Sequence, residues 1–163
     1  MSLPYSKIMV PLDGSDLAAN ALPHAVLLAQ SFGAELVLVR VVDDLARQEP
    51  EMMEAELHEQ GVELIRQQLA RTTQQAEAEL GRATDELTAR SLETTAVVLV
   101  GEAPDLILDY AHRSDVDLIV MSTHGRTGLS RWLFGSVAEK VYRRAHCPVL
   151  IVRVANETVR SVG

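Results

Sequence analysis

Residues 117–136 read DLIVMSTHGRTGLSRWLFGS. The apolar, β-branched run at 118–121 predicts a buried strand. Glycines and residues with hydroxyl side chains follow it, and a helical pattern begins at 135–142. A strand, a glycine-containing polar loop and a helix start are typical of phosphate sites. Glycines let the backbone approach, amides and hydroxyls donate hydrogen bonds, and the helix start adds partial positive charge. We therefore predict an anion-binding loop between Met121 and Ser136.

Apolar runs and helical patterns alternate along the rest of the chain. The expected strands are 7–12, 36–42, 94–100, 117–121 and 149–152. The expected helices are 17–32, 51–89, a short one around 106–111, and 136–145. Gly33 should end the first helix, and Gly81 leaves open a break in the long one. Near-continuously apolar strands alternating with helices predict a doubly wound parallel α/β sheet.

In such a sheet the ligand lies outside the carboxyl ends of the strands, at a topological switch point. Here those ends are Asp13–Ser15, Val41–Asp43, Gly101 and Ser122–Gly125. The polar loop after residue 121 is therefore one of the positions where a ligand is expected. Ser15 or Asp16 is expected to cap the helix that follows. Asp13 could likewise be no more than a turn or helix cap, but its place at a strand end favours ligand contact.

Composition bounds the class of protein. The chain has 15 basic and 23 acidic residues, a formal net charge of −8, which argues against a general nucleic-acid or anionic-membrane surface. Its one cysteine, Cys147, excludes an internal disulfide and a cysteine zinc site, and fits a reducing compartment. No signal peptide and no apolar run of about 20 residues is recognisable. We expect one cytoplasmic domain over 1–154 with a polar tail, 155–163.

Several patterns favour ordinary structural roles. Gly125 and Gly128 alone could serve turn geometry, and neither GxxxxGK[ST] nor GxGxxG after the first strand is present. The long helix reads as an amphipathic cover for the sheet in preference to a coiled-coil seam, because no apolar heptad is sustained. His124 does not indicate catalysis. Surface or packing roles are also expected for the other histidines, the two aromatic residues of the loop and the acidic pairs: His24, His58, His112, His146, Trp132, Phe134, Asp43, Asp44, Asp115 and Asp117.

Four segments together resemble the universal stress protein family: Pro11–Ser15, Met121–Gly128, Gly135–Ala138 and Cys147–Val152. The resemblance covers nearly the whole domain, in order. It implies a five-stranded parallel sheet of order 3-2-1-4-5. It also implies a homodimer through the last strand, Val149, Leu150, Ile151 and Val152, which would otherwise be an exposed sheet edge.

The ATP-binding branch of this family carries Gly-x2-Gly-x9-Gly-Ser/Thr. Here the pattern is Ser122-x2-Gly125-x9-Gly135-Ser136, with serine in place of the first glycine. Serine is small, and its hydroxyl can itself bond a phosphate oxygen. The substitution also leaves open the alternative that this chain is a family member that binds no nucleotide.

The resemblance implies a role for each matching residue. Asp13 would accept hydrogen bonds from ribose hydroxyls, and backbone groups of Val41 would meet the adenine edge. ATP, with Mg²⁺ held through its phosphates, would be the ligand. The remaining predicted site residues line the adenine pocket, lie at strand ends or hold the phosphates: Pro11, Leu12, Gly101, Met121, Ser122, His124, Gly125, Arg126, Gly135, Ser136 and Val137.

The leading functional hypothesis is an adenine-nucleotide-binding stress or regulatory protein rather than an enzyme, because no water-activating base is evident. If hydrolysis occurs, we expect it to be slow. One alternative is a family member that acts only through protein contacts. Another is an enzyme that cleaves ATP to adenylate a substrate. Enzymes of that class carry a Ser-Gly-Gly-x-Asp-Ser loop after the first strand, whereas residues 11–16 here, PLDGSD, lack the paired glycines.

Overall fold

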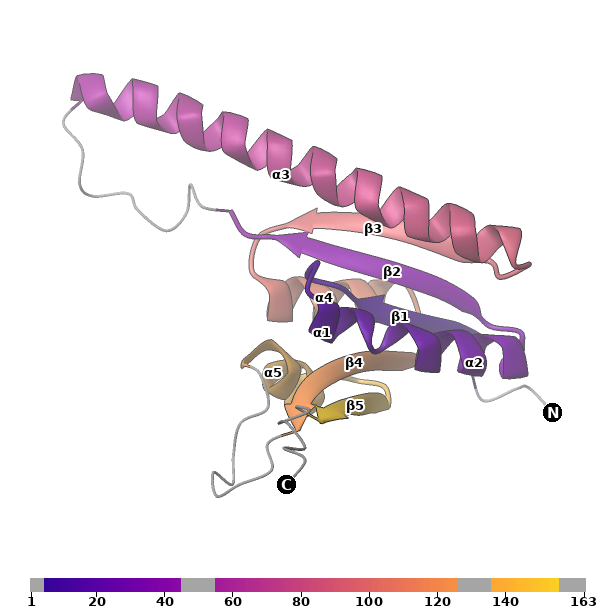
Figure 1. Cartoon of the computed structure of the whole chain (residues 1–163). Helices are drawn as coiled ribbons and strands as arrows, with labels where there is room; N and C mark the ends of the chain where they lie inside the picture. The colour runs from indigo at the N-terminus through magenta and orange to yellow at the C-terminus, as the bar shows by residue number, and fades with distance from the viewer. Residues whose placement is uncertain (1–4, 45–54, 126–135, 156–163) are drawn as a thin grey trace, which may run out of the picture.

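A computed structural model describes residues 5–44, 55–125 and 136–155. Within them, strands alternate with helices (Figure 1). The strands are β1 (Lys7–Pro11), β2 (Glu35–Val42), β3 (Thr94–Val100), β4 (Leu118–Gly125) and β5 (Val149–Ala155). The helices are α1 (Asp16–Ala19), α2 (Leu22–Phe32), α3 (Ala55–Ala89), α4 (Ala103–Arg113) and α5 (Ser136–Arg144). All strand pairs are parallel and the sheet order is β3-β2-β1-β4-β5. The predicted fold class and strand order are confirmed.

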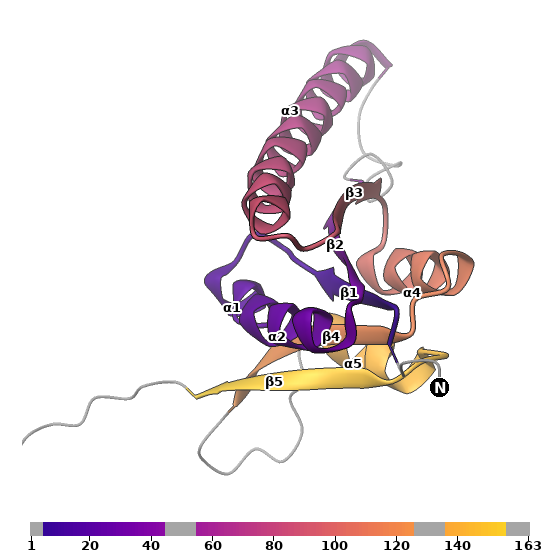
Figure 2. The same ribbon diagram turned by 90° about the vertical axis from the view of Figure 1, so that its right-hand side faces the viewer.

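The sheet is covered on both faces, as its apolar strands require (Figure 2). Alternate residues of β1 point to opposite faces. Ile8 and Val10 pack with residues of α2 and α3, whereas Met9 packs with residues of α4 and α5. Each of these three β1 side chains is fully buried. The core is therefore two apolar layers separated by the sheet.

The first predicted helix, 17–32, is two helices in the structure, so that prediction is wrong in detail. α1 ends at Ala19 and α2 begins at Leu22, with Pro23 in its first turn. Proline lacks the N–H that a continuous helix would need and crowds the preceding turn, which explains the break. The predicted Ser15 cap is confirmed, because Ser15 Oγ accepts a hydrogen bond from the Ala18 amide at 3.1 Å. Gly33 ends α2 with φ +66°, as expected.

α3 is unbroken through Gly81, so the alternative with a break there is not observed. Its 35 residues span roughly 50 Å, about twice the length of β2. The half that covers the sheet carries the buried residues Ala76, Leu80 and Leu87. The other half extends past the carboxyl ends of β2 and β3 (Figure 1). Neither α3 nor any other helix in the described residues is apolar enough over a sufficient length to cross a membrane.

β4 and β5 are longer than predicted. Residues 122–125 were expected in a loop, but they belong to β4 and pair with 152–155 of β5. Ala155, expected in the tail, is the last residue of β5. Ladder pairing along this whole length satisfies the backbone groups, and it outweighs the loop-like composition of residues 122–125. Residues 156–163 lie outside the described residues.

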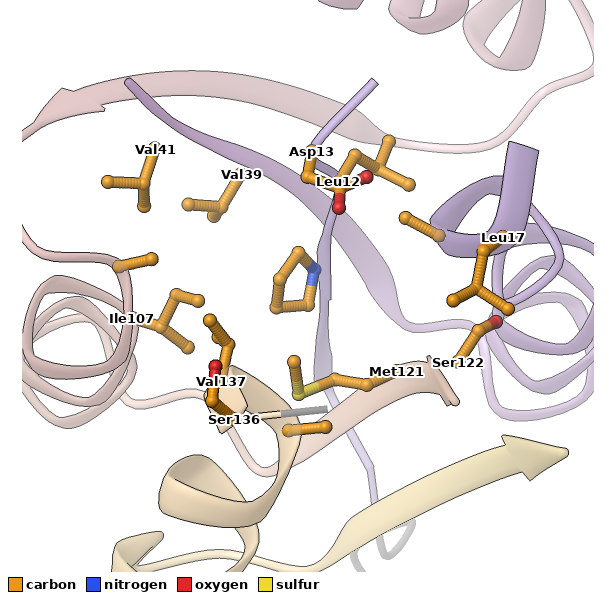
Figure 3. Close-up of a pocket in the computed structure, with 14 residues that line it drawn as sticks. Leu12, Asp13, Leu17, Val39, Val41, Ile107, Met121, Ser122, Ser136 and Val137 are labelled. Carbon is orange, nitrogen blue, oxygen red and sulfur yellow. The ribbon is translucent and has the colours of Figure 1, made fainter. Parts of the chain in front are cut away.

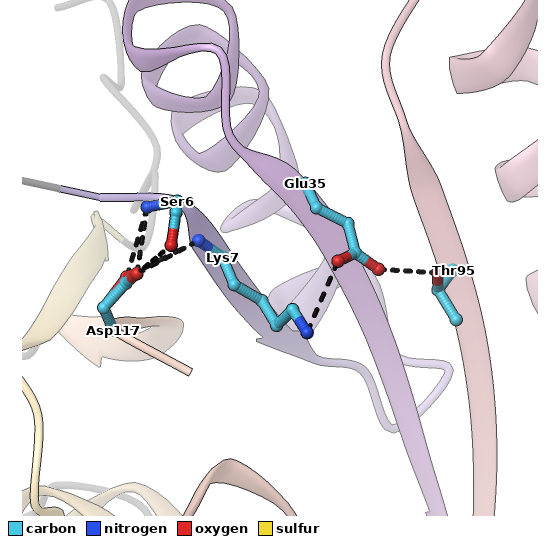
Figure 4. Close-up of polar contacts among 5 residues, drawn as sticks. All are labelled: Ser6, Lys7, Glu35, Thr95 and Asp117. Carbon is cyan, nitrogen blue, oxygen red and sulfur yellow. Dashed lines mark hydrogen bonds and ion pairs between the residues drawn. The ribbon is translucent and has the colours of Figure 1, made fainter. Parts of the chain in front are cut away.

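Asp117 was expected to be a solvated or turn residue, and this prediction is wrong. It is half-buried just before β4, and its carboxylate accepts hydrogen bonds from the amides of Ser6 and Lys7 at 2.9 and 3.2 Å (Figure 4). On the neighbouring strand, Glu35 pairs with Lys7 Nζ at 3.5 Å and accepts a bond from Thr95 Oγ1 at 2.7 Å. These contacts tie the amino ends of four adjacent strands together, opposite the end where a ligand is expected.

Candidate functional site

A cavity of about 250 Å³ lies at the carboxyl ends of β1 and β4 (Figure 3). The structure brings much of the predicted site together around it. The predicted residues that line this cavity are Pro11, Leu12, Asp13, Val41, Met121, Ser122, Ser136 and Val137. They come from β1 and the turn after it, β2, β4 and the start of α5, so segments far apart in sequence form one site. We call this cavity the central cavity.

Apolar walls of the central cavity include residues that sequence reasoning missed. These are Leu17, Ala18, Val39, Ala103, Ile107 and Ala138. Val39 and Ile107 are almost fully buried, at 0% and 2% exposed. Val39 could have been found, because it is two residues from Val41 on one strand and must share its face. Ile107 could not, since nothing in the sequence says which helix covers that face.

Among the residues that the structure describes, Asp13 is the charged residue that lines the central cavity. Its Oδ1 accepts hydrogen bonds from the amide and hydroxyl of Ser15 at 2.9 and 2.5 Å. No hydrogen bond from another described residue reaches the second oxygen, Oδ2. Partial burial raises the pKa of Asp13, but the Ser15 hydrogen bonds and the nearby Arg40 charge outweigh it, so the pKa lies below its ordinary value. Asp13 is therefore a carboxylate at neutral pH with one oxygen free to accept from a ligand.

Ser122 lines the same cavity next to Leu17 (Figure 3). Its Oγ is shielded from solvent and has no hydrogen-bond partner among the described residues. A buried hydroxyl left without a partner costs about 1–3 kcal/mol. A ligand oxygen that reached Ser122 would supply the missing bond. The residue that departs from the glycine pattern is thus compatible with a polar ligand.

The start of α5 supplies the complementary feature for an anion. Ser136 and Val137 are the first residues of this helix, and both line the central cavity. The first amides of a helix have no partner within it, and the helix dipole makes this end partially positive. The cavity therefore has an apolar slot, one hydrogen-bond-accepting carboxylate and a helix start suited to an anion.

The remaining predicted residues lie elsewhere. Gly101 follows β3 with φ +142° and lines a separate hollow with Asp43 and Glu102, so the structure does not place it on the central cavity. β3 is an edge strand, separated from β1 by β2, so its carboxyl end lies away from the central cavity. The backbone of His124 and Gly125 ends β4. Arg126, Gly128, Trp132, Phe134 and Gly135 lie outside the described residues, as does the side chain of His58.

Comparison with known proteins gives consistent results. The model of the Universal stress protein family matches residues 4–153. Universal stress protein MJ0531 of Methanocaldococcus jannaschii is 37% identical over 149 residues, which cover 91% of this chain and 82% of that protein. The solved structure of protein MJ0577 superposes with a TM-score of 0.74 at 27% identity and covers 94% of this chain and 99% of that one. The universal stress protein from Archaeoglobus fulgidus in complex with dAMP gives a TM-score of 0.57 at 26% identity, over 90% and 97% of the two chains.

Proposed function

The chain belongs to the universal stress protein family, and we propose that it is an adenine-nucleotide-binding regulatory protein whose ligand is ATP. The observation that carries the proposal is that one cavity combines an apolar slot, the free oxygen of Asp13 and the start of α5. A nucleotide needs these three environments together: apolar walls for the base, an acceptor for the sugar hydroxyls and donors for the phosphates. The dAMP complex of the Archaeoglobus fulgidus relative supports the choice of adenine.

Each part of the central cavity has a role in this proposal. Val39, Val41 and Ile107 present aliphatic surface to the adenine ring, and the backbone of Val41 meets its edge. Asp13 accepts hydrogen bonds from the ribose hydroxyls through Oδ2. Ser136 and Val137 receive the phosphates at the start of α5. The family resemblance adds Gly125, Arg126 and Gly135 to the phosphate side.

A divalent cation would be held through the nucleotide rather than by the protein. Among the residues that the structure describes, no group of three or more His, Cys, Asp or Glu side chains is arranged to hold a metal ion. Mg²⁺ is usually bound through substrate phosphates and water, and this arrangement suits ATP. We therefore propose Mg²⁺ as part of the bound ligand.

We also propose that the protein binds nucleotide without catalysing fast turnover. The described residues of the central cavity include no histidine or second carboxylate near Asp13 that could activate water. Any hydrolysis is expected to be slow. The single cysteine fits action in the reducing cytoplasm.

A homodimer through β5 completes the proposal. β5 is an edge strand of the sheet, and its Leu150 is 38% exposed. An apolar edge strand of this kind is a template for pairing with a second copy. The dimer would place two nucleotide sites on one particle.

The test is thermal unfolding with and without excess ATP and Mg²⁺, after a check for nucleotide carried through purification. Ligand at 100 times its dissociation constant stabilises the folded state by about 2.7 kcal/mol. We expect the full shift in wild type and in the control Asp85→Ala, whose side chain is exposed on α3, and a smaller shift in Asp13→Ala. No shift, with no co-purified nucleotide, would overturn the proposal in favour of a protein that acts through protein contacts. Release of pyrophosphate would point instead to adenylation.

A further inference from the structure

Arg40 is a charged residue within the apolar run of β2, residues 36–42. It lies on β2 between Val39 and Val41, and its side chain is only 16% exposed. A cation this far inside a protein needs a partner to offset the loss of hydration. Its Nη1 donates to Glu79 Oε2 on α3 at 3.1 Å, and the Gln75 amide donates to the other oxygen of Glu79 at 2.9 Å. Arg40 is therefore anchored to the long helix.

The Arg40 guanidinium also lies against Gly14. A β-carbon at Gly14 would lie 2.8 Å from Arg40 Cζ and still closer to its nitrogens, so any side chain at position 14 would displace the guanidinium. Gly14 also has φ +83°, a conformation that disfavours other residues. Glycine at position 14 thus allows both the turn and the approach of Arg40.

The supported turn carries Asp13. A second cavity, of about 330 Å³, separates this turn from α3, and its lining includes Asp13, Arg40, Gln68 and Thr72. Asp13 lines both cavities, whereas Arg40 lines only the second. Arg40 therefore acts on the central cavity only through Asp13 and its turn. It does not line the space where the base and phosphates would lie.

We propose that Arg40 is a positioning residue of the nucleotide site: anchored by Glu79, it supports the Asp13–Gly14 turn so that Asp13 presents its free oxygen to the ribose hydroxyls. This inference rests on the proposed nucleotide function. It assigns to Arg40 a specificity for ligands with vicinal hydroxyls, because the contact that it supports is made only with those groups. It also links α3 mechanically to the ligand through Glu79.

The decisive experiment compares two ligands, ATP and 2′,3′-dideoxy-ATP, which lacks both ribose hydroxyls. Dissociation constants are measured by calorimetry for wild type, Arg40→Met, Asp13→Ala and the double variant. We expect Arg40→Met to weaken ATP binding about fivefold to tenfold, the effect of about one ordinary hydrogen bond, and to leave 2′,3′-dideoxy-ATP binding unchanged. In the Asp13→Ala background, Arg40→Met should have no further effect.

Controls separate this role from a general one. Arg66→Met removes an exposed arginine of α3, which pairs only with Glu63 among the described residues, and should change neither affinity. Glu79→Gln keeps the volume of the anchor but removes its charge, so it should reproduce part of the Arg40→Met effect. Equal weakening of both nucleotides in Arg40→Met, or no weakening, would overturn the inference while the proposed function stands. Absence of ATP binding in wild type would overturn both.

A ligand-free measurement covers the case in which Arg40→Met is poorly folded. Gly14→Ala should lower the melting temperature more than Gly33→Ala, because Gly33 also has a positive φ (+66°) but no atom lies within 4 Å of its missing β-carbon. In an Arg40→Lys background, where the bulky guanidinium is absent, the loss from Gly14→Ala should shrink toward that of Gly33→Ala. The same loss in both backgrounds would show that Arg40 does not support the turn.

Discussion

Ser6 and Asp117 are 111 residues apart in sequence, and both the hydroxyl and the amide of Ser6 donate to Asp117 Oδ2, at 2.6 and 2.9 Å (Figure 4). The Lys7 amide shares the same carboxylate. Asp117, the residue before β4, is thus joined to the residues at the start of β1. β1 and β4 carry proposed ligand residues at their opposite ends.

Replacement of Asp117 should therefore reduce stability without changing ligand affinity directly. In Asp117→Ala the amides of Ser6 and Lys7 lose a charged acceptor, and we expect a loss of about 1–3 kcal/mol in the free energy of unfolding. Urea denaturation measures it, with the exposed Asp85→Ala as the matched control, for which the change should be within about 0.5 kcal/mol. A wild-type midpoint in Asp117→Ala would show that the contact is not stabilising.

Replacement of Ser122 should change stability and ATP affinity in opposite directions. Ser122→Ala removes a buried hydroxyl that has no partner among the described residues, so the ligand-free protein should keep or gain stability, by up to about 1 kcal/mol. If the ligand supplies the missing bond, ATP affinity should fall about fivefold to tenfold. Thr84→Val is the control, because Thr84 Oγ1 is also buried without a described partner but lies on α3. That variant should gain stability with unchanged affinity. Unchanged affinity in Ser122→Ala would remove Ser122 from the ligand contacts.

Protonation of Asp13 should set the low pH at which the preference for ATP is lost. Burial raises the pKa of Asp13, but the Ser15 hydrogen bonds and the Arg40 charge lower it by more than burial raises it. The pKa in the folded protein therefore lies below the ordinary ~3.9. The stabilising contribution of the carboxylate is thus fully present above that ordinary value and is lost as the pH falls through the lower, folded value. The preference for ATP over 2′,3′-dideoxy-ATP should consequently be constant between pH 7 and pH 5. A loss of preference within this range in wild type would contradict the assignment, and Ser15→Ala should move the loss to higher pH.

The dimer prediction can be tested at Leu150. The side chain of Ile151 packs against the buried core, so a charge there would disturb the fold itself, whereas Leu150 is exposed. Leu150→Lys should shift the protein from dimer to monomer in sedimentation velocity, because it places like charges on two paired edges. Leu27→Lys, at an exposed leucine of α2, is the control and should remain dimeric. A dimer that survives Leu150→Lys would place the interface elsewhere.

Several parts of the site could be predicted from local sequence. Asp13 was identified because it follows an apolar run and Val41 because it lies at the end of one, and parallel strands bring their carboxyl ends to one edge of the sheet. Ser15 was identified as a cap because a hydroxyl before a helical pattern serves that role. Ser136 and Val137 were identified from a helical pattern that begins after a polar loop. Each inference needed only neighbours a few residues away.

Other features depended on the pairing of distant segments. Residues 122–125 look like a loop, but ladder bonds to 152–155 make them strand. Gly101 lies at a strand end, yet β3 is at the edge of the sheet and its end opens onto a different hollow. Asp117 looks like a surface carboxylate until Ser6 and Lys7 are placed beside it. No local pattern reports such contacts.

The sequence by itself determined the alternation of strands and helices, the parallel sheet and the edge at which the predicted site residues gather, because apolar periodicity and turn residues act over short distances. The tertiary structure alone decided that Ile107 closes the central cavity and that Arg40, anchored by Glu79, lies beneath Gly14. The physical reason is that burial, ion pairing and steric fit are properties of side chains brought together by packing. They take effect only when α3 and α4 are placed on the two faces of the sheet.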